Sequence, residues 1–573
     1  VVRFNEDYTV EQVIERLAPL GEVQYATPNR QIKRSYDPTR KAMPLTRETL
    51  EAIKRQTRAT QGEYPFNDEL MVKQWNLINR GDLFTGTEAC EVSRSVVGAD
   101  VQCEEAWKLS TGDPSIIVAV LDEGVCQTHP ELRDNIWTNE DEIDGSKKDN
   151  DGNGYAGDIH GFNFVTNTGI ITWGDLNDTG RGTHVAGVIA AQNDNGGIGS
   201  IAGGTPDKPG VKIMSCQIFA GNAGGNSMSS VKAIKYAADN GAVILQCSWG
   251  YTSGTANSYE WGTPGYADEE QWETLAPLEK DALDYFTHNA GSPNGPIDGG
   301  IAVFASGNEY ANSAGFPGAA SMCVSVAATA ADFTPATYTN YGPGTNISAP
   351  GGDRDYYWDY GEGALRGEAG CVFSTLPYNV SETGFGYMEG TSMACPHVSG
   401  VVALGLSYAA QQRRHFTADE FKKLLYETAT PIDEYIQGTK FYYRYAYDLG
   451  YTNPTQMMLS NYTGQMGVGQ VNAKRLLDAI AQNGTPMRFP NLYIPLDGEV
   501  TTLPATFFLN GESLTYTVTI ENQAVATSRT EGAKIIFSGL KEGSTKASIA
   551  ASDGTTHNFN ITVRQSASGS GWL

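Results

Sequence analysis

The chain of 573 residues is too long for a single hydrophobic core, so about three or four domains are expected. Its 40% hydrophobic residues and 65 glycines fit a loop-rich α/β protein and argue against a disordered chain, while the net charge of −26 argues against a nucleic-acid partner. No apolar stretch approaches the roughly eighteen residues of a membrane span, and the nearest one, residues 399–410, is predicted to be a buried helix.

The charge is unevenly distributed along the chain. Residues 1–60 hold 11 basic and 8 acidic residues, whereas the remainder holds 29 basic and 58 acidic residues. Because opposite charges favour association, the two parts are expected to dock, with a chance imbalance as the alternative. The chain starts at Val1 without a signal-peptide pattern. We therefore expect that a signal peptide has been removed and that the protein is secreted, cell-surface or periplasmic.

The first sixty residues are predicted to form a small α+β module. Val10, Val13, Ile14 and Leu17 lie at helical spacing and predict an amphipathic helix, flanked by short strands. A second, charged helix is predicted over residues 46–58, before the turn-rich residues 62–65. The module is expected to end at residue 60, and a main domain over residues 61–483 is expected to follow.

Buried strands and helices alternate through this main domain. The predicted strands, all strongly apolar, are residues 116–121, 211–218, 242–247, 301–305 and 322–327. The predicted helices between and after them are residues 185–192, 229–240, 270–289 and 398–412. This alternation predicts a doubly wound α/β fold with a parallel sheet, in which ligands bind at the carboxyl ends of the strands.

The pattern changes after Asn483. Residues 484–565 show two-residue alternation and turn signals without a helical stretch. We therefore predict a C-terminal all-β domain over residues 484–573, a sandwich of the immunoglobulin-like kind.

The eight cysteines contain no Cys-x-x-Cys pair, which argues against a zinc ribbon or a thioredoxin-type site. Cys216, Cys247 and Cys323 lie in apolar runs and are expected to be buried hydrophobic residues. Disulfides among the cysteines are permitted in an exported protein, but their pairing cannot be deduced from the sequence.

Two motifs place reactive side chains at element ends. Asp122 ends the first buried strand and is followed by the segment His129-Pro130-Glu131-Leu132. Ser392 lies in the segment Gly390-Thr391-Ser392-Met393-Ala394-Cys395-Pro396-His397-Val398-Ser399-Gly400. Gly390 permits a tight turn that brings Ser392 to a helix start, where the free amides and the helix dipole favour a developing negative charge. The structural alternatives are a turn-forming aspartate and a helix-capping serine.

Together these motifs resemble those of the subtilisin-like serine proteases, over about residues 66–481. The resemblance implies that Asp122 and Ser392 belong to an Asp/His/Ser triad and that Asn308 donates to the oxyanion, a turn asparagine being the alternative. It implies two walls of a substrate groove, formed by Ser248, Trp249 and Gly250 and by Ala305, Ser306 and Gly307. It also implies that residues 1–60 are an inhibitory propeptide.

One residue departs from the pattern of that family. The segment Thr179-Gly180-Arg181-Gly182-Thr183-His184-Val185-Ala186-Gly187 has Arg181 where the family carries its general-base histidine. A guanidinium stays protonated and has no acceptor lone pair, so it cannot take a proton from a serine. We expect Arg181 to form an ion pair with Asp122. His184 and His397 match structural positions and are not expected to replace the base.

Glu123 also departs from the family, which carries a hydroxyl residue there, so the hydrogen bond normally made to the aspartate is in question.

A glycine-rich acidic loop follows the first strand. Oxygen-bearing residues alternate around glycines over residues 149–158, a pattern typical of loops that wrap a hard cation. A structural Ca²⁺ is therefore expected, with an acidic surface loop as the alternative. The candidate ligands are Asp149, Asp151, Asn153, Tyr155 and Asp158.

The sequence thus predicts a subtilisin-like serine endopeptidase precursor that acts on polypeptides. Its own propeptide is the expected intramolecular inhibitor, and Arg181 is expected to leave it inactive or nearly so. The alternative is a natural pseudoprotease that binds peptides or proteins without cleaving them.

Overall fold

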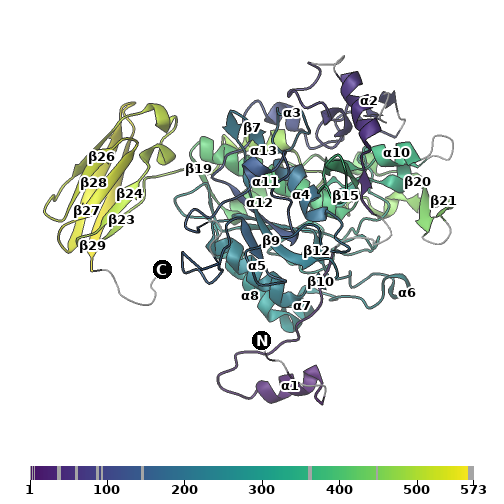
Figure 1. Cartoon of the computed structure of the whole chain (residues 1–573), viewed down its shortest axis with the longest axis horizontal. Helices are drawn as coiled ribbons and strands as arrows, with labels where there is room; N and C mark the ends of the chain where they lie inside the picture. The colour runs from purple at the N-terminus through teal and green to yellow at the C-terminus, as the bar shows by residue number, and fades with distance from the viewer. Residues whose placement is uncertain are drawn as a thin grey trace. The chain divides into compact units, whose positions relative to one another are not determined.

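The computed structural model describes residues 2, 4, 7–34, 41–57, 62–84, 89–91, 94–143, 147–358, 364–446 and 450–565 (Figure 1). The chain forms two compact units. Unit 1 comprises Val1–Gly291, Gly299–Tyr408 and Ala418–Ala479, and unit 2 comprises Ser292–Asp298, Ala409–Thr417 and Ile480–Leu573. The boundary predicted between residues 60 and 61 lies outside the described residues.

Unit 1 is built on a mostly parallel eight-stranded sheet. Seven strands follow the order β10-β9-β5-β11-β14-β15-β16, and β6 also pairs with β9. Only β10 is antiparallel to its neighbour. The strands are β5 (Ile117–Glu123), β6 (Gly161–Asn163), β9 (Lys212–Ala220), β10 (Ala223–Gly224), β11 (Ile244–Cys247), β14 (Ile301–Ala305), β15 (Val324–Thr329) and β16 (Ile347–Pro350). The predicted parallel α/β fold is confirmed, and all five predicted strands are present.

Helices cover both faces of this sheet. Figure 1 shows α5 (Ser227–Asp239) and α8 (Pro277–Asn289) on one face and α4 (Arg181–Ala190) and α11 (Thr391–Gln411) on the other. The strands are therefore buried on both faces, and every residue of β11, β14 and β15 is buried. This double cover explains why the strands are continuous apolar runs in the sequence.

Two predicted helices differ from the observed ones. The helix predicted over residues 270–289 is two helices, α7 (Glu269–Leu275) and α8, because Pro277 begins a new helix after Ala276. Helix α11 starts at Thr391 rather than at residue 398 and contains Pro396. Its length and apolar composition would permit a membrane span, but it is fully buried inside the protein, as predicted for residues 399–410.

Within unit 1, two short strands join the N-terminal segment, residues 1–60, to the rest of the unit. The predicted helices are present as α1 (Val10–Leu17) and α2 (Arg47–Thr57). Strand β1 (Lys33–Arg34) pairs with β12 (Trp249–Gly250), and β2 (Met43–Pro44) pairs with β18 (Phe385–Met388), both antiparallel. Ile53 of α2 is completely buried, so this helix belongs to the packed body of unit 1.

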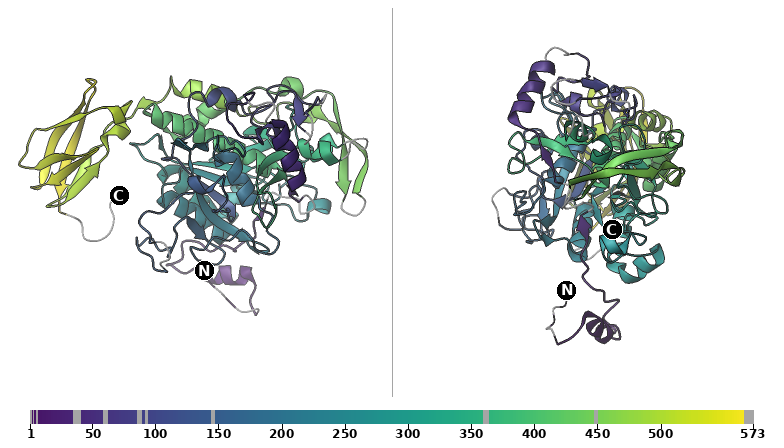
Figure 2. Two further views of the ribbon diagram at one scale, coloured as in Figure 1. Left: turned by 45° about the horizontal axis from the view of Figure 1, so that its top comes forward. Right: turned by 90° about the vertical axis from the view of Figure 1, so that its right-hand side faces the viewer.

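The remaining elements of unit 1 are short, apart from α12 and the antiparallel hairpin of β20 and β21 (Figure 2). The helices are α3 (Cys103–Ala106), α6 (Ser258–Trp261), α9 (Arg354–Tyr357), α10 (Ala364–Ala369), α12 (Ala418–Glu427) and α13 (Ala473–Ile480), with 3-10 turns at Met71–Lys73, Arg133–Asn135, Asp433–Tyr435 and Leu459–Asn461. The strands are β3 (Asp82–Phe84), β4 (Ala89–Glu91), β7 (Gly204–Thr205), β8 (Lys208–Pro209), β17 (Val372–Thr375), β20 (Thr439–Ala446) and β21 (Gly450–Met458).

Unit 2 is dominated by β structure, as predicted for the C-terminal region. One sheet has the order β23-β29-β28-β25, and a second has the order β24-β27-β26. Their strands are β23 (Leu492–Pro495), β24 (Glu499–Thr502), β25 (Tyr516–Ile520), β26 (Ala526–Glu531), β27 (Lys534–Gly539), β28 (Gly543–Ala551) and β29 (Thr556–Arg564). A third sheet joins β13 (Ile297–Asp298), β19 (Arg414–Thr417) and β22 (Thr485–Pro486), and 3-10 turns lie at Pro504–Phe507 and Gly511–Ser513.

The seven cysteines whose side chains the structure describes are all buried free thiols. Among them, Cys216, Cys247 and Cys323 are at most 1% exposed, which confirms their prediction as buried hydrophobic residues.

Candidate active site

Asp122 lies at the carboxyl end of β5, next to the last residue of that strand. Its side chain is 1% exposed, and its Oδ1 accepts a hydrogen bond from the backbone N–H of Glu123 at 2.7 Å. The strand thus fixes a buried carboxylate at the edge of the sheet where ligands of this fold class bind.

Arg181 is the first residue of α4 and faces Asp122. Its Nε lies 3.1 Å from Oδ1 and 3.2 Å from Oδ2 of Asp122, which confirms the predicted ion pair. The side chain is completely buried, and its guanidinium carbon lies 5.9 Å from the ring centre of Phe219. Within the described part of the chain, Nη1 and Nη2 have no hydrogen-bond partner. Only one edge of the guanidinium is therefore satisfied.

Glu123 holds the start of α4. Its carboxylate accepts hydrogen bonds from the backbone N–H and the hydroxyl of Thr179, and from the backbone N–H of Arg181 at 3.1 Å. An acidic group at this position also interacts favourably with the helix dipole. The glutamate that departs from the expected hydroxyl residue therefore anchors the helix, while its own backbone N–H bonds to Asp122.

Ser392 is the second residue of α11, on the opposite side of a tight turn from β18. Gly390 adopts φ +141°, a conformation that side chains disfavour, and this turn leads directly into the helix. The carbonyl of Ser392 accepts a hydrogen bond from the Ser248 hydroxyl at 2.8 Å, and the Ser392 hydroxyl lies 3.5 Å from the Ser248 carbonyl. The predicted serine and the predicted groove wall are thus in direct contact.

Asn308 follows β14 and is oriented by Thr391. Its Oδ1 accepts hydrogen bonds from the backbone N–H of Thr391 at 2.9 Å and from the Thr391 hydroxyl at 2.8 Å. With the oxygen held this way, Nδ2 lies on the side of Gly390, 3.5 Å from where a Cβ at that glycine would stand. The amide group is therefore directed at the turn that carries Ser392.

The second predicted wall continues β14 beyond Ala305. The carbonyl of Ser306 accepts a hydrogen bond from the side-chain amide of Asn340 at 3.0 Å. Gly307 has φ +111°, and its backbone N–H bonds to the Thr391 hydroxyl at 3.3 Å. The structure thus brings this wall and the start of α11 together.

The first predicted wall binds the N-terminal segment. Lys33 pairs with Gly250 and Arg34 with Trp249, so that β1 lies antiparallel on this wall. On the other side, the backbone N–H of Ile32 donates to the Gly225 carbonyl at 2.7 Å. Gln31 forms an antiparallel bridge with Asn226. Residues 31–34, called the leader strand below, therefore lie between two segments of the body.

Gly225 and Asn226 were not identified from the sequence as part of this groove. The sequence feature that could have identified them is the glycine-rich turn after β9, which ends at Ala220. This turn places backbone groups within reach of an extended peptide. Ile32 is only 4% exposed, so the leader strand also buries an aliphatic side chain.

The two neighbouring histidines are buried and structural. His184 Nε2 lies 3.2 Å from the Val372 carbonyl, and His397 lies 2.7 Å from the Met393 carbonyl and 2.8 Å from Asn76. Burial lowers the pKa of His184 to about 3 and that of His397 to about 4. Within the described residues, the hydrogen bonds of both rings go to groups other than Ser392, in agreement with the structural role expected of them.

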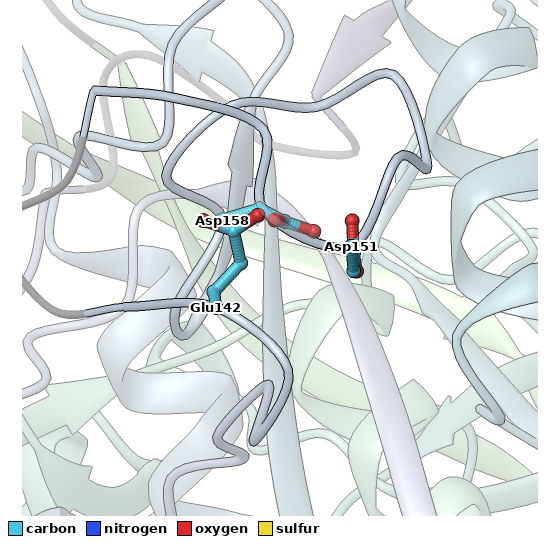
Figure 3. A group of neighbouring side chains, drawn as sticks. All are labelled: Glu142, Asp151 and Asp158. Atoms are coloured by element: carbon cyan, nitrogen blue, oxygen red, sulfur yellow. The ribbon is translucent and has the colours of Figure 1, made fainter.

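Only some of the predicted metal ligands lie close to one another. Ligand atoms of Glu142, Asp151 and Asp158 lie within 4.8 Å of one another (Figure 3). The side-chain amides of Asn139 and Asn153 each donate to both Asp151 and Asp158. Glu142 precedes the glycine-rich loop and was not identified from the sequence.

The other predicted ligands have different roles. The carboxylate of Asp149 accepts hydrogen bonds from the backbone N–H groups of Gly152 and Gly154 and so shapes the loop. The Tyr155 ring packs against Phe162 and Tyr236, each at 4.9 Å between ring centres. The structure thus brings Asp151 and Asp158 together with Glu142, places the Asp149 side chain next to Asp151, and packs the Tyr155 ring among aromatic residues.

Comparisons with known proteins agree on one family. The model of the Subtilase family matches residues 113–464, more than half of the chain. Halolysin of Haloferax mediterranei is 29% identical over 54% of this chain and 44% of its own length. A thermophilic serine proteinase of a Bacillus species is 27% identical over 59% and 62%, and an extracellular protease of Xanthomonas campestris is 29% identical over 54% and 47%.

A solved structure has a similar fold. The serine protease of Aeromonas sobria, solved in complex with a chaperone, aligns over 86% of this chain and 92% of its own, with 17% identity and a TM-score of 0.51. The chain covers less than two thirds of the length of the first two curated relatives.

Proposed function

The chain belongs to the subtilase family, and we propose that it is a serine endopeptidase precursor whose general base is replaced by Arg181. Two sets of contacts carry this proposal. Asp122 forms an ion pair with Arg181, and Ser392 contacts Ser248, which directly precedes the strand Trp249–Gly250 that binds the leader strand. Polypeptides are the proposed substrates, because an extended strand is what the groove already binds.

In the proposed parent reaction, Ser392 attacks the carbonyl of a peptide bond. A histidine at position 181 would take the hydroxyl proton and return it to the leaving amine, and Asp122 would orient that imidazole. The Nδ2 of Asn308 and the backbone N–H of Ser392, at the start of α11, would stabilise the oxyanion. The pairing of β1 with β12 supports the binding mode, since antiparallel backbone pairing fixes the register of a substrate.

Arg181 removes the proton-transfer step from this scheme. Its guanidinium has no lone pair to accept the Ser392 proton, and its ion pair with Asp122 occupies the carboxylate that would orient a base. In subtilisin, a member of the same family, loss of the base alone lowers turnover about a millionfold. We therefore propose that the chain is inactive or nearly inactive and keeps its N-terminal segment attached.

The N-terminal segment is the proposed intramolecular inhibitor. Residues 31–34 pair with both sides of the groove, and Ile32 is buried there, so a substrate could bind only after this segment leaves. The positive charge of the first sixty residues on an acidic body supports this arrangement.

A peptide-binding pseudoprotease is the second candidate. One observation favours it: the groove holds a peptide strand although position 181 carries an arginine. In that case the protein would bind extended segments of partners without cleaving them.

A structural Ca²⁺ is proposed at the acidic cluster. Three carboxylates within 4.8 Å of one another repel unless a cation or protons lie among them, and carboxylate oxygens are the ligands that Ca²⁺ prefers. Glu142, Asp151 and Asp158 would hold the ion, whose charge would stabilise the loop that packs its Tyr155 against the core.

The proposed location is outside the cell, since a relative from Xanthomonas campestris is named an extracellular protease. Unit 2 is proposed to contain an immunoglobulin-like module appended to the protease.

The test of the proposed function is Arg181→His in the full chain, followed by intact-mass measurement. Self-cleavage is expected to release a fragment that ends after Arg34 and before Phe66, and the processed protein is expected to cleave casein. The matched control is the double variant Arg181→His/Ser392→Ala, which is expected to stay intact. An Arg181→His protein that folds but neither processes itself nor cleaves casein would refute the enzyme proposal and favour the pseudoprotease.

A further inference from the structure

This inference rests on the proposed function and concerns Arg30, two residues before the buried Ile32. The backbone of Arg30 is fixed by the start of α5. Its N–H donates to the Ser227 hydroxyl at 3.0 Å, and its carbonyl accepts from the Ser227 N–H at 2.8 Å. The groove therefore extends beyond the leader strand and determines where the side chain at this position begins.

The guanidinium of Arg30 lies over an aromatic ring. Its central carbon is 5.6 Å from the ring centre of Tyr266, within the range of a cation–π contact. Its Nε is buried and has no hydrogen-bond partner in the described part of the molecule. The ring of Tyr266 thus provides the main attraction for this charge.

A cavity of about 600 Å³ lies beside this contact, with Arg30 and Tyr266 in its lining. Tyr251 and Tyr266 meet edge to face on its wall, with ring centres 5.0 Å apart. The residues that line the cavity include Arg30, Gln31, Tyr251, Thr252, Tyr266 and Gln271. Arg30 lines this space without filling it, so the cavity has room for the side chain of another peptide.

A buried carboxylate lies behind the aromatic wall. Glu279 is 1% exposed, and its oxygens accept hydrogen bonds from the Trp272 indole at 2.8 Å and from the Tyr251 hydroxyl at 3.4 Å. Burial raises the pKa of the Tyr266 hydroxyl, the nearby Arg30 cation lowers it, and the Glu279 carboxylate raises it. Glu279 therefore bonds to Tyr251, and the ring of Tyr251 meets the ring of Tyr266 that Arg30 contacts.

We propose that this cavity is a substrate subsite that selects an arginine two residues before an aliphatic residue. Tyr266 supplies the ring face, and Glu279, whose pKa is raised by burial to about 7, supplies a negative charge near Tyr251 above that pH. A planar guanidinium stacks on a ring better than an ammonium does, so arginine is preferred to lysine. In the leader this position is Arg30, and the aliphatic residue is Ile32.

The test uses peptides based on residues 27–38 and the processed Arg181→His protein. In one peptide the position of Arg30 carries arginine, and in others it carries citrulline, lysine or glutamine. Citrulline has the same shape as arginine without its charge. The arginine peptide is expected to have a KM about three- to thirtyfold lower than the citrulline peptide, with kcat unchanged, because the contact is the same before and during the reaction. Equal KM values for the two peptides would overturn the proposal.

Variants of the protein test which residues cause the preference for arginine over citrulline. Tyr266→Leu and Glu279→Gln are each expected to reduce the preference for arginine over citrulline, whereas Tyr266→Phe keeps the ring face and is expected to retain it. The preference is a ratio measured within one variant, so a general loss of stability or activity does not alter it. A Tyr266→Leu protein with undiminished preference would place the recognition elsewhere.

A measurement on the uncleaved chain separates this proposal from the proposed function. Arg30→Gln in the Arg181 protein is expected to speed amide hydrogen exchange at Ile32, whose N–H bonds to Gly225. If Arg181→His neither processes itself nor cleaves casein, the enzyme proposal fails, and the exchange rate alone decides whether Arg30 anchors the bound strand. Unchanged exchange would then refute the subsite as well.

Discussion

Arg181 contacts both carboxylate oxygens of Asp122 through Nε alone, at 3.1 and 3.2 Å, while its two terminal nitrogens have no partner in the described part of the chain. A buried ion pair with unsatisfied donors is a costly arrangement, because desolvation of the unpaired groups offsets the attraction. The two residues nevertheless depend on each other, because removing either one leaves the charge of the other buried and unpaired.

A double-mutant cycle should measure this coupling. Arg181→Met leaves Asp122 as an unpaired buried charge and is expected to lower the free energy of unfolding by about 3 kcal/mol. Adding Asp122→Asn removes that charge, so the double variant should be clearly more stable than the sum of the single losses predicts. Urea unfolding of the four proteins gives the coupling energy. Strict additivity would mean that the two side chains do not interact.

Imidazole should rescue a variant that lacks a side chain at position 181. Arg181→Gly opens the space beside Asp122, and added imidazole can enter it and act as the base. Intact-mass measurement is expected to show self-cleavage that depends on imidazole concentration. The same addition to the Arg181 protein is expected to have no effect, because the guanidinium fills the site. Absence of rescue, together with an active Arg181→His protein, would show that the site does not admit the free base.

Calcium should raise the melting temperature through the acidic cluster. A ligand at a hundred times its Kd stabilises the folded protein by about 2.7 kcal/mol. Glu142→Gln and Asp158→Asn are expected to lose this response, measured by calorimetry with Ca²⁺ or with EDTA. Asp113→Asn is the matched control, since its carboxylate contacts Ser115 outside the cluster. A response that survives in both cluster variants would place the ion elsewhere.

Glu279 should make the protein less stable as the pH rises. Burial raises the pKa of this carboxyl from 4.5 to about 7 in the folded protein. Its contribution to stability is fully present below pH 4.5 and is lost as the pH rises to about 7, because the unfolded chain releases the proton first. Relative to Glu279→Gln, this loss is expected to reach about 3 kcal/mol above pH 7. Parallel stability curves for the two proteins would contradict the assignment.

Three buried histidines should make the protein sensitive to acid. Burial lowers the pKa of His129 and His397 to about 4 and that of His184 to about 3, all from 6.5. Their stabilising contribution is present above pH 6.5 and is lost as the pH falls to about 4 and below, because only the unfolded chain binds the protons in that range. His397→Gln should reduce the proton uptake on unfolding at pH 5 by about one proton. Chemical denaturation at several pH values measures that uptake.

The sequence predicted the sheet well because each central strand is covered by helices on both faces. A strand such as Ile301–Ala305 is entirely apolar, and this signal does not depend on distant contacts. The ends of the strands then located Asp122 and Asn308. Helix boundaries were predicted less well: Pro277 splits one helix, whereas Pro396 lies inside another.

Residues brought in by tertiary contacts could not be predicted in the same way. Glu142 stands among other acidic residues in the segment Glu140-Asp141-Glu142-Ile143-Asp144, so the local sequence does not single it out, and it joins Asp151 and Asp158 only because the loop folds back. The same is true of Tyr266, which meets Arg30 across more than two hundred residues of chain. The metal loop was identified by its glycines, but which of its oxygens converge depends on packing.

The hydrogen bonds that the Glu123 carboxylate accepts at the start of α4 have a practical consequence. They reach the backbone N–H groups of Thr179 and Arg181 and therefore do not depend on which side chain position 181 carries. The helix can thus be expected to form around many different residues there. Position 181 becomes a place where histidine, smaller residues or unnatural bases of different basicity can be exchanged within one scaffold. The rate of self-cleavage could then be compared directly with the proton affinity of the group installed.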